Sequence, residues 1–102
     1  MNNYSQELQD WTRKNFASIG YTFMKSASHK FYTIGYDRSL YIDDEAERLI
    51  PDTEKSKDIV LFKFERKSID WLSGKSIPVE GIEYYKSFND IDEMLDDDWV
   101  AD

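Results

Sequence analysis

The chain has 102 residues, 16% of them aromatic, no cysteine and a formal net charge of −8 at pH 7. A chain of this length is expected to form one domain, residues 1–102. The aromatic content excludes intrinsic disorder, whose signature is a scarcity of aromatic residues. The lack of cysteine excludes disulfides, thiol nucleophiles and cysteine-based zinc sites.

No targeting or membrane segment is visible. The longest aliphatic and aromatic run is residues 59–62, whereas a membrane-spanning helix needs about twenty apolar residues. The first eleven residues lack the basic and apolar regions of a signal peptide. We therefore expect no contact with a membrane and a cytoplasmic location.

The first predicted element is an amphipathic helix over residues 4–19. Its apolar side chains fall within an arc of about 140° on a helical wheel. Asn3 is a suitable N-cap, and Gly20 follows at the position where helices commonly end. The apolar stripe consists of Tyr4, Leu8, Trp11, Phe16 and Ile19.

A β-hairpin is predicted next, because two aromatic and partly β-branched runs, residues 21–27 and 30–37, flank a short polar break. Residues 39–42 are expected to form a third strand after a turn. A short acidic helix should follow, capped by Asp43 or Asp44 and ended by Pro51.

The clearest strand is residues 58–66. It is apolar on both faces at its start and on one face later, which is typical of a central strand. One or two helical turns are predicted at 68–73. One face of the clearest strand carries Val60, Phe62 and Phe64, and the other carries Ile59 and Leu61.

A further strand at residues 82–88 and a C-terminal amphipathic helix over 88–99 complete the chain. The apolar arc of that helix holds Phe88, Ile91, Leu95 and Trp99. The pattern predicts an α+β fold. It comprises a mainly antiparallel sheet of about four to five strands, with the N-terminal, middle and C-terminal helices packed on one face of it.

Charge is distributed unevenly. Residues 1–89 hold fourteen acidic and thirteen basic side chains, whereas residues 90–102 hold seven acidic and no basic ones. A second acidic zone spans residues 37–54. Because a nucleic-acid-binding protein needs a basic stripe, we expect no nucleic-acid partner. Acidic zones favour a basic protein partner instead, whose encounter they accelerate.

The acidic C-terminal run is not an EF-hand, because Met94, Leu95 and Ala101 stand where the fifth, sixth and twelfth loop positions need an oxygen ligand, Gly and Glu. Its last acids lie at the negative end of the predicted helix dipole, without a basic residue four positions away. Two explanations stay open: solubility of an aromatic-rich protein, or engagement of a basic partner.

Catalytic patterns are weak. His29 is the only histidine and is expected to be a solvated residue of the hairpin turn. Asp52, Glu65 and Lys67 match the PD…(D/E)xK arrangement of magnesium-dependent nucleases. Asp52, however, precedes a loop-like stretch, and the chain lacks a basic surface for phosphates. We expect no catalytic residues, no metal site and no cofactor.

The function that we expect is that of a small acidic inhibitor that neutralises a basic protein. In size, acidity and aromatic content the chain is similar in physical type to immunity proteins for bacterial nuclease toxins, although it carries no family motif. The alternatives are a nucleic-acid mimic that blocks a DNA-binding enzyme, the metal nuclease, and an oligomer whose aromatic side chains meet at a dimer interface. The candidate partner-binding residues are Asp92, Glu93, Asp96, Asp97, Asp98 and Trp99, followed by Asp43, Asp44 and Glu47.

Overall fold

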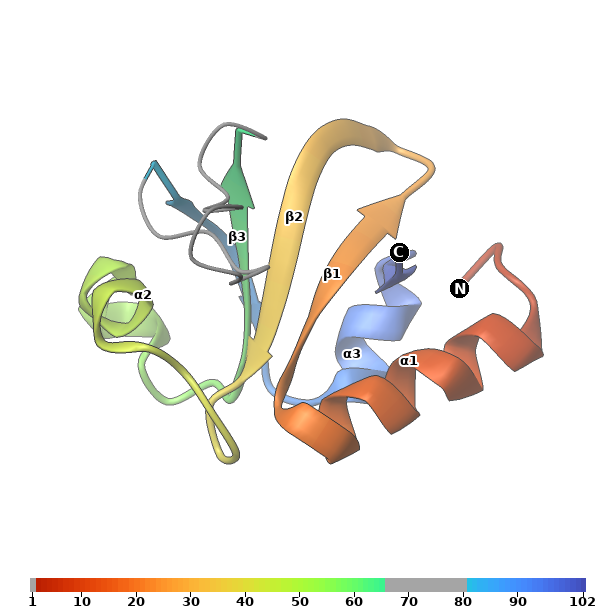
Figure 1. The fold of residues 1–102 in the computed structure, drawn as a ribbon, viewed down its shortest axis with the longest axis horizontal. Coiled ribbons are helices and arrows are strands. Elements are labelled where there is room, and N and C mark those ends of the chain that lie inside the picture. Colours follow the sequence, from red (N-terminus) through yellow and green to blue (C-terminus); the bar gives the residue numbers. More distant parts are fainter. Residues whose placement is uncertain (1, 66–80) are drawn as a thin grey trace, which may run out of the picture.

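The structure, a computed structural model, describes residues 2–65 and 81–102. Five antiparallel strands form one sheet in the order β4-β3-β2-β1-β5 (Figure 1). The predicted α+β fold with a mainly antiparallel sheet is confirmed. The strands are β1 (Tyr21–Ser26), β2 (His29–Asp37), β3 (Ile59–Phe64), β4 (Glu83–Phe88) and β5 (Val100–Ala101).

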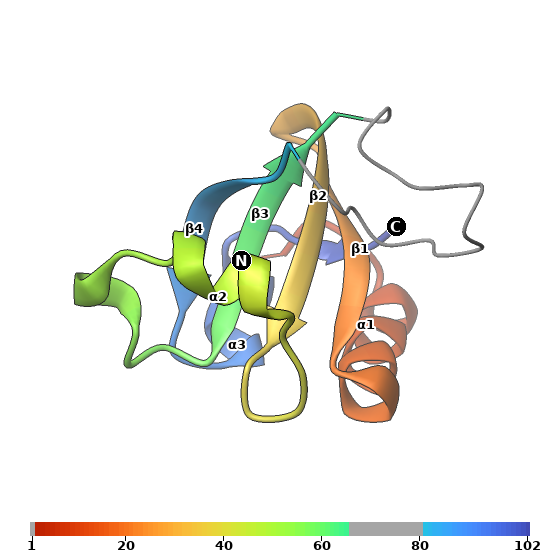
Figure 2. The same ribbon diagram turned by 60° about the vertical axis from the view of Figure 1, so that its left-hand side comes forward.

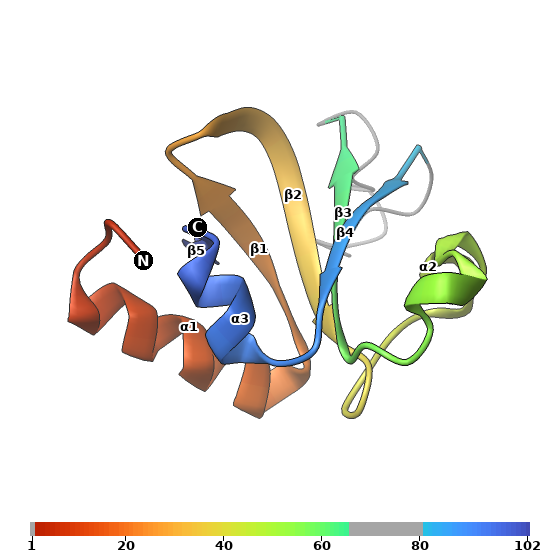
Figure 3. The same ribbon diagram turned by 180° about the vertical axis from the view of Figure 1, so that it is seen from behind.

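Helices lie on both faces of this sheet. α1 (Gln6–Ile19) and α3 (Ile91–Asp96) cover one face, and α2 (Asp44–Leu49) covers the other (Figures 1 and 3). The prediction that all helices share one face was wrong for α2. The cause is visible in β3, whose apolar side chains point both ways and therefore need cover on both sides.

The described residues form two hydrophobic cores. Ile59 and Leu61 of β3 pack with α1, α3 and the chain end, and Val60 and Phe62 pack with α2. β3 lies between β4 and β2, as its two-sided pattern predicted. The first core contains Phe16, Met24, Phe88, Met94, Leu95, Trp99 and Val100 besides these β3 residues, and the second contains Ile34, Tyr36, Ala46, Ile50 and Phe64.

α1 begins two residues later than its apolar pattern suggested. Ser5, and not Asn3, is the N-cap, because its hydroxyl accepts a hydrogen bond from the Leu8 amide at 3.2 Å. Gly20 ends the helix with φ +80°, as predicted, and its N–H donates to the Phe16 carbonyl. A Cβ at Gly20 would lie only 2.8 Å from the Cβ of Tyr41, so the position excludes larger residues.

The predicted third strand at residues 39–42 is absent, and a turn takes its place. The amides of Leu40 and Tyr41 both donate to the Asp37 carbonyl at 2.9 Å. The Asp37 carboxylate accepts from the amide and the hydroxyl of Ser39 at 3.1 and 2.6 Å. An aspartate that binds the backbone two residues later reverses the chain, and this local turn outweighs the β propensity of the segment.

The C-terminal helix is shorter than its periodicity predicted. Asp90 caps α3, since its carboxylate accepts from the Glu93 amide at 2.9 Å, and the helix ends at Asp96 instead of residue 99. Asp98 then adopts φ +70° and turns the chain into β5. β5 pairs antiparallel with β1 at the sheet edge. The helical turns predicted at 68–73 lie outside the described residues.

Candidate functional site

The last acids of the C-terminal run have structural partners that are distant in sequence. Asp97 accepts hydrogen bonds from the Lys86 ammonium of β4 at 2.9 Å and from the Trp99 indole at 3.3 Å. Asp98 accepts from the Asn3 amide at 2.8 Å. The Lys86 ammonium and the Asn3 amide therefore stabilise two carboxylates that have no basic residue four positions away along the chain.

Trp99 belongs to the core. Its side chain is 1% exposed and stacks on the His29 ring at 5.3 Å between centroids. Tyr85 meets both rings edge-on and places its hydroxyl 3.0 Å from His29 Nε2. The ring of Trp99 is thus buried and cannot contact a partner protein in this conformation. His29 was expected to be a solvated turn residue, but it begins β2 and lies within this aromatic cluster.

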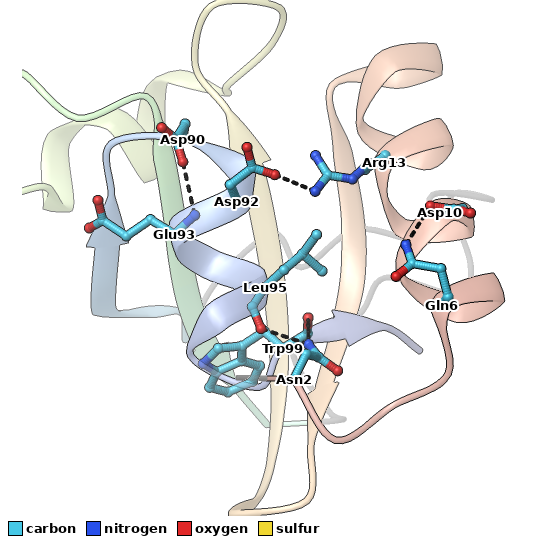
Figure 4. A network of polar contacts seen from close by, with 9 residues as sticks. All are labelled: Asn2, Gln6, Asp10, Arg13, Asp90, Asp92, Glu93, Leu95 and Trp99. Carbon is cyan, nitrogen blue, oxygen red and sulfur yellow. Dashed lines mark hydrogen bonds and ion pairs between the residues drawn. The ribbon is translucent and has the colours of Figure 1, made fainter.

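The acids of α3 are closer to solvent. Asp92 forms an ion pair with Arg13, which reaches across from α1 (Figure 4). Glu93 accepts from the Asn89 amide group at 3.0 Å, and Asp96 is exposed. At the other end of α3, the Asn2 side chain donates to the Leu95 carbonyl at 2.7 Å and ties the N-terminal segment to this helix.

The acids of α2 occupy the opposite face of the sheet. The Tyr36 hydroxyl donates to Asp43 at 3.0 Å, and burial together with this carboxylate raises the pKa of Tyr36. Glu47 forms a two-point contact with the Arg38 guanidinium at 2.7 and 3.0 Å. Asp44 is exposed. The acids at α2 and those of α3 therefore lie on opposite faces of the sheet, which argues against a continuous band that mimics nucleic acid.

A different group of carboxylates converges at one end of the molecule. A shallow hollow of about 320 Å³, called the acidic hollow below, lies where β2 ends, β3 begins and α3 begins. Its carboxylates are Asp37, Asp58, Asp90 and Asp92, and Arg13 is the only base among the described residues that line it. In Figure 2, β2 ends and the β4–α3 connection leaves the sheet at its lower end. Ser39, Ile59, Asn89 and Ile91 complete the lining.

Strand register explains this convergence. Asp37 is the last residue of β2 and pairs with Ile59, the first of β3, so Asp58 lies beside the end of β2. Ile59 also pairs with Phe88 of β4, and α3 begins shortly after that residue. Antiparallel pairing thus gathers the end of one strand and the start of the next at the same sheet edge.

The partners of these carboxylates differ. Asp37 binds Ser39, Asp90 caps α3 and Asp92 pairs with Arg13. Asp58 is exposed and makes no side-chain hydrogen bond or ion pair with any described residue. One guanidinium facing four carboxylates leaves an excess of negative charge, so the hollow favours a cationic group from outside.

Of the four carboxylates of the hollow, only Asp92 was a candidate contact from the sequence. Asp37 was counted within the second acidic zone, and Asp58 was passed over as the start of a strand. The usable signal was positional: Asp37 is the last residue of the predicted strand 30–37, and Asp58 is the first residue of the predicted strand 58–66. If the two strands pair antiparallel, the two carboxylates must meet.

An apolar patch adjoins the hollow. Leu40 is 57% exposed, its Cβ lies against Gly20, and the neighbouring Ile19 is exposed as well. Leu40 lies within the turn that starts at Asp37, and Ile19 is next to Gly20, whose carbonyl accepts from the Asp37 amide at 2.7 Å. An exposed apolar centre beside a charged rim is typical of a surface that binds protein.

Other kinds of site find little support among the described residues. No group of three or more His, Asp or Glu side chains in residues 2–65 and 81–102 could hold a metal ion. Asp52 lies in the 3₁₀ helix Asp52–Glu54 with a fully exposed side chain, and Lys67 of the nuclease pattern lies outside the described residues. None of the described helices combines the length and the apolar sequence needed to cross a membrane.

Comparison with known proteins identifies no relative: no family model, curated protein or solved structure matches the chain. Function must therefore be argued from the geometry of this chain alone.

Proposed function

We propose that the protein is a binding protein without catalytic activity that neutralises a basic partner protein in the cytoplasm, as an immunity protein neutralises a bacterial nuclease toxin. The observation that carries the proposal is the acidic hollow. Carboxylates from the end of β2, the start of β3 and the start of α3 line it together, and within residues 2–65 and 81–102 Arg13 is the one base that lines it with them. A lysine or arginine side chain of the partner would supply the missing positive charge.

The contact surface extends from the hollow in two directions. Leu40 and Ile19 provide exposed apolar area on one side. Glu93 and Asp96 on the exposed side of α3 continue the negative charge on the other. An apolar centre that loses water on binding supplies affinity, and the charged rim supplies the rate of encounter and the orientation.

The candidate contact residues expected from the sequence differ in exposure and in position on the sheet. Asp92, Glu93 and Asp96 stay within the proposed surface. Asp97 and Asp98 are held by Lys86 and Asn3, and their main effect is expected on stability. Trp99 is buried, and α2, with Asp43, Asp44 and Glu47, lies on the far face of the sheet.

Two variants with equal charge change separate the hollow from net charge. The hollow variant carries Asp37→Asn, Asp58→Asn and Asp90→Asn. Asparagine preserves the turn at position 37 and is as good an N-cap as aspartate at position 90. The control variant carries Asp44→Asn, Glu45→Gln and Asp52→Asn, which are exposed and lie outside the hollow.

The test is capture of a partner from an extract of the native host, followed by an assay of that partner's own activity. Wild-type protein and the control variant should capture a basic protein and abolish its activity at a 1:1 ratio. The hollow variant should fail in both. Capture of an acidic or neutral protein, or equal capture by both variants, would contradict the proposal.

A further inference from the structure

One flank of α1 exposes a large aromatic ring between two opposite charges. Trp11 is 54% exposed, the largest aromatic side chain that the described residues leave in water. Glu7 precedes it by four residues and Lys14 follows it by three, and both are exposed. All three line one shallow hollow along the helix.

The spacing places these side chains on one stripe. Seven residues advance a helix by about two turns, short by about 20°, so Glu7 and Lys14 lie nearly above one another. Trp11 projects from between them. The stripe runs along the flank of α1 that faces away from α3, because Arg13, which contacts Asp92 of α3, lies about 100° or more around the helix from each of the three.

Neither charge is compensated within the described part of the chain. Glu7 and Lys14 make no hydrogen bond or ion pair there. The other charges of the same helix are used: Asp10 accepts from Gln6 at 3.0 Å, and Arg13 pairs with Asp92. An exposed tryptophan between two unpaired opposite charges is a self-complementary arrangement.

We propose that α1 binds α1 of a second copy of this chain in an antiparallel pair. A two-fold axis between residues 10 and 11 places Glu7 of each copy opposite Lys14 of the other. The same axis brings the two Trp11 rings together at the centre. A two-fold interface uses the same patch on both copies, and the order acid–aromatic–base along one stripe meets that requirement.

This interface leaves the acidic hollow free. The hollow includes Arg13, which points to the α3 side of the helix, whereas the stripe lies on the other flank. A dimer would thus present two hollows, one from each copy. The inference does not depend on the proposed function, since dimerisation and partner binding use different surfaces.

The dimer is expected to be weak. A single pair of four-turn helices buries less area than the roughly 1,200 Å² at which stable interfaces begin. Most of the affinity should come from the two tryptophan rings, which are the residue type most enriched among interface hot spots. The dimer should therefore dissociate on dilution.

Sedimentation equilibrium of the full chain over a hundredfold range of concentration tests it. Wild-type protein should pass from monomer to dimer within that range. Trp11→Ala should shift the midpoint at least tenfold towards higher concentration. Wild-type protein that stays monomeric throughout would overturn the proposal.

Charge reversal distinguishes the proposed antiparallel pairing from non-specific association through the ring. Glu7→Lys places lysine against lysine, and Lys14→Glu places glutamate against glutamate, so each alone should weaken the dimer. The double variant Glu7→Lys/Lys14→Glu restores both pairs and should return the midpoint towards that of wild type. Glu45→Lys on α2 is the matched control and should change nothing. A double variant weaker than either single variant would overturn the pairing.

Discussion

The two acidic zones look alike in sequence and differ in structure. In residues 37–54, Glu47 is locked to the largely buried Arg38, and Asp43 accepts from the buried Tyr36. At the chain end, Asp92 meets the exposed Arg13, and Asp97 meets the half-exposed Lys86. The acids at α2 are thus tied to buried partners on one face of the sheet, whereas those at the chain end meet exposed bases near the other face.

The acidic hollow gathers carboxylates that are far apart in sequence. Its carboxylates come from three separate segments, and only strand register brings them together. The lesson is that clustering along the chain says little about clustering in space once a sheet intervenes. Substitutions at Arg38, Tyr36, Asp98 and Arg13 test this contrast, beginning with the most destabilising.

Removal of Arg38 should cost the most stability. Its side chain is 15% exposed and donates to both oxygens of Glu47 and to the carbonyls of Lys55 and Lys57. Arg38→Ala would leave these acceptors without a donor, and the free energy of unfolding should fall by about 3 kcal/mol. Urea denaturation measures the change. A loss below about 1 kcal/mol would show that this ion pair is no stronger than a surface pair.

Alkaline pH should destabilise the protein through Tyr36. Burial and the nearby Asp43 raise the pKa of its hydroxyl in the folded state, whereas the unfolded chain releases that proton near pH 10. The unfolded state then binds fewer protons, so the stability present below about pH 10 is lost as the pH rises, by up to about 1.4 kcal/mol per unit.

Tyr36→Phe is the matched variant for this effect. It removes one titrating hydroxyl, so the decline in the free energy of unfolding above pH 10 should become shallower by about one proton. Denaturant titrations at pH 8 and pH 11 provide the comparison. Equal slopes in wild type and variant would mean that Tyr36 ionises as easily in the folded protein as in the unfolded chain.

Asp98 should matter for the backbone more than for its charge. It combines φ +70° with a hydrogen bond from the Asn3 amide. Asp98→Ala loses the acceptor and disfavours the left-handed conformation, at a cost of about 1–2 kcal/mol. Asp98→Asn keeps an acceptor and tolerates this conformation, so its melting temperature should stay near that of wild type. Equal losses in the two variants would assign the effect to charge.

The smallest effect is expected at Arg13. Its ion pair with Asp92 is solvent-exposed, with 46% of the Arg13 side chain accessible. Arg13→Ala should change the free energy of unfolding by no more than about 0.5 kcal/mol. The same variant removes a base that lines the acidic hollow, so it should bind a basic partner at least as fast as wild type. Slower binding would show that Arg13 itself contacts the partner.

Local patterns of the sequence predicted most of the described elements. The stripe of α1, the hairpin of β1 and β2 and the two-sided strand β3 follow directly from side-chain periodicity. Gly20 ends α1 as expected. These features depend on neighbours within a few residues, and such neighbours can be read from the sequence.

The errors arose where a distant or non-periodic contact decides the structure. Asp37 closes a turn where β propensity indicated a strand. Helical periodicity continued to Trp99, but α3 ends at Asp96 and Asp98, with its positive φ, turns the chain into β5. Trp99 was assigned to the apolar arc of the C-terminal helix and also named as a partner contact, and its burial against His29 agrees with the first assignment. The candidate site was missed because no local pattern relates Asp37 to Asp58 or Asp90.

The rate constant of association with the captured partner, measured by stopped flow at several salt concentrations, shows whether the acidic hollow receives that partner. If the acidic hollow receives the partner, the hollow variant should associate at least tenfold more slowly than wild type at low salt and show a weaker salt dependence. The control variant should stay within about twofold of wild type, since only its net charge has changed. Equal slowing by the two variants would contradict the account, because net charge and not the hollow would then guide the partner.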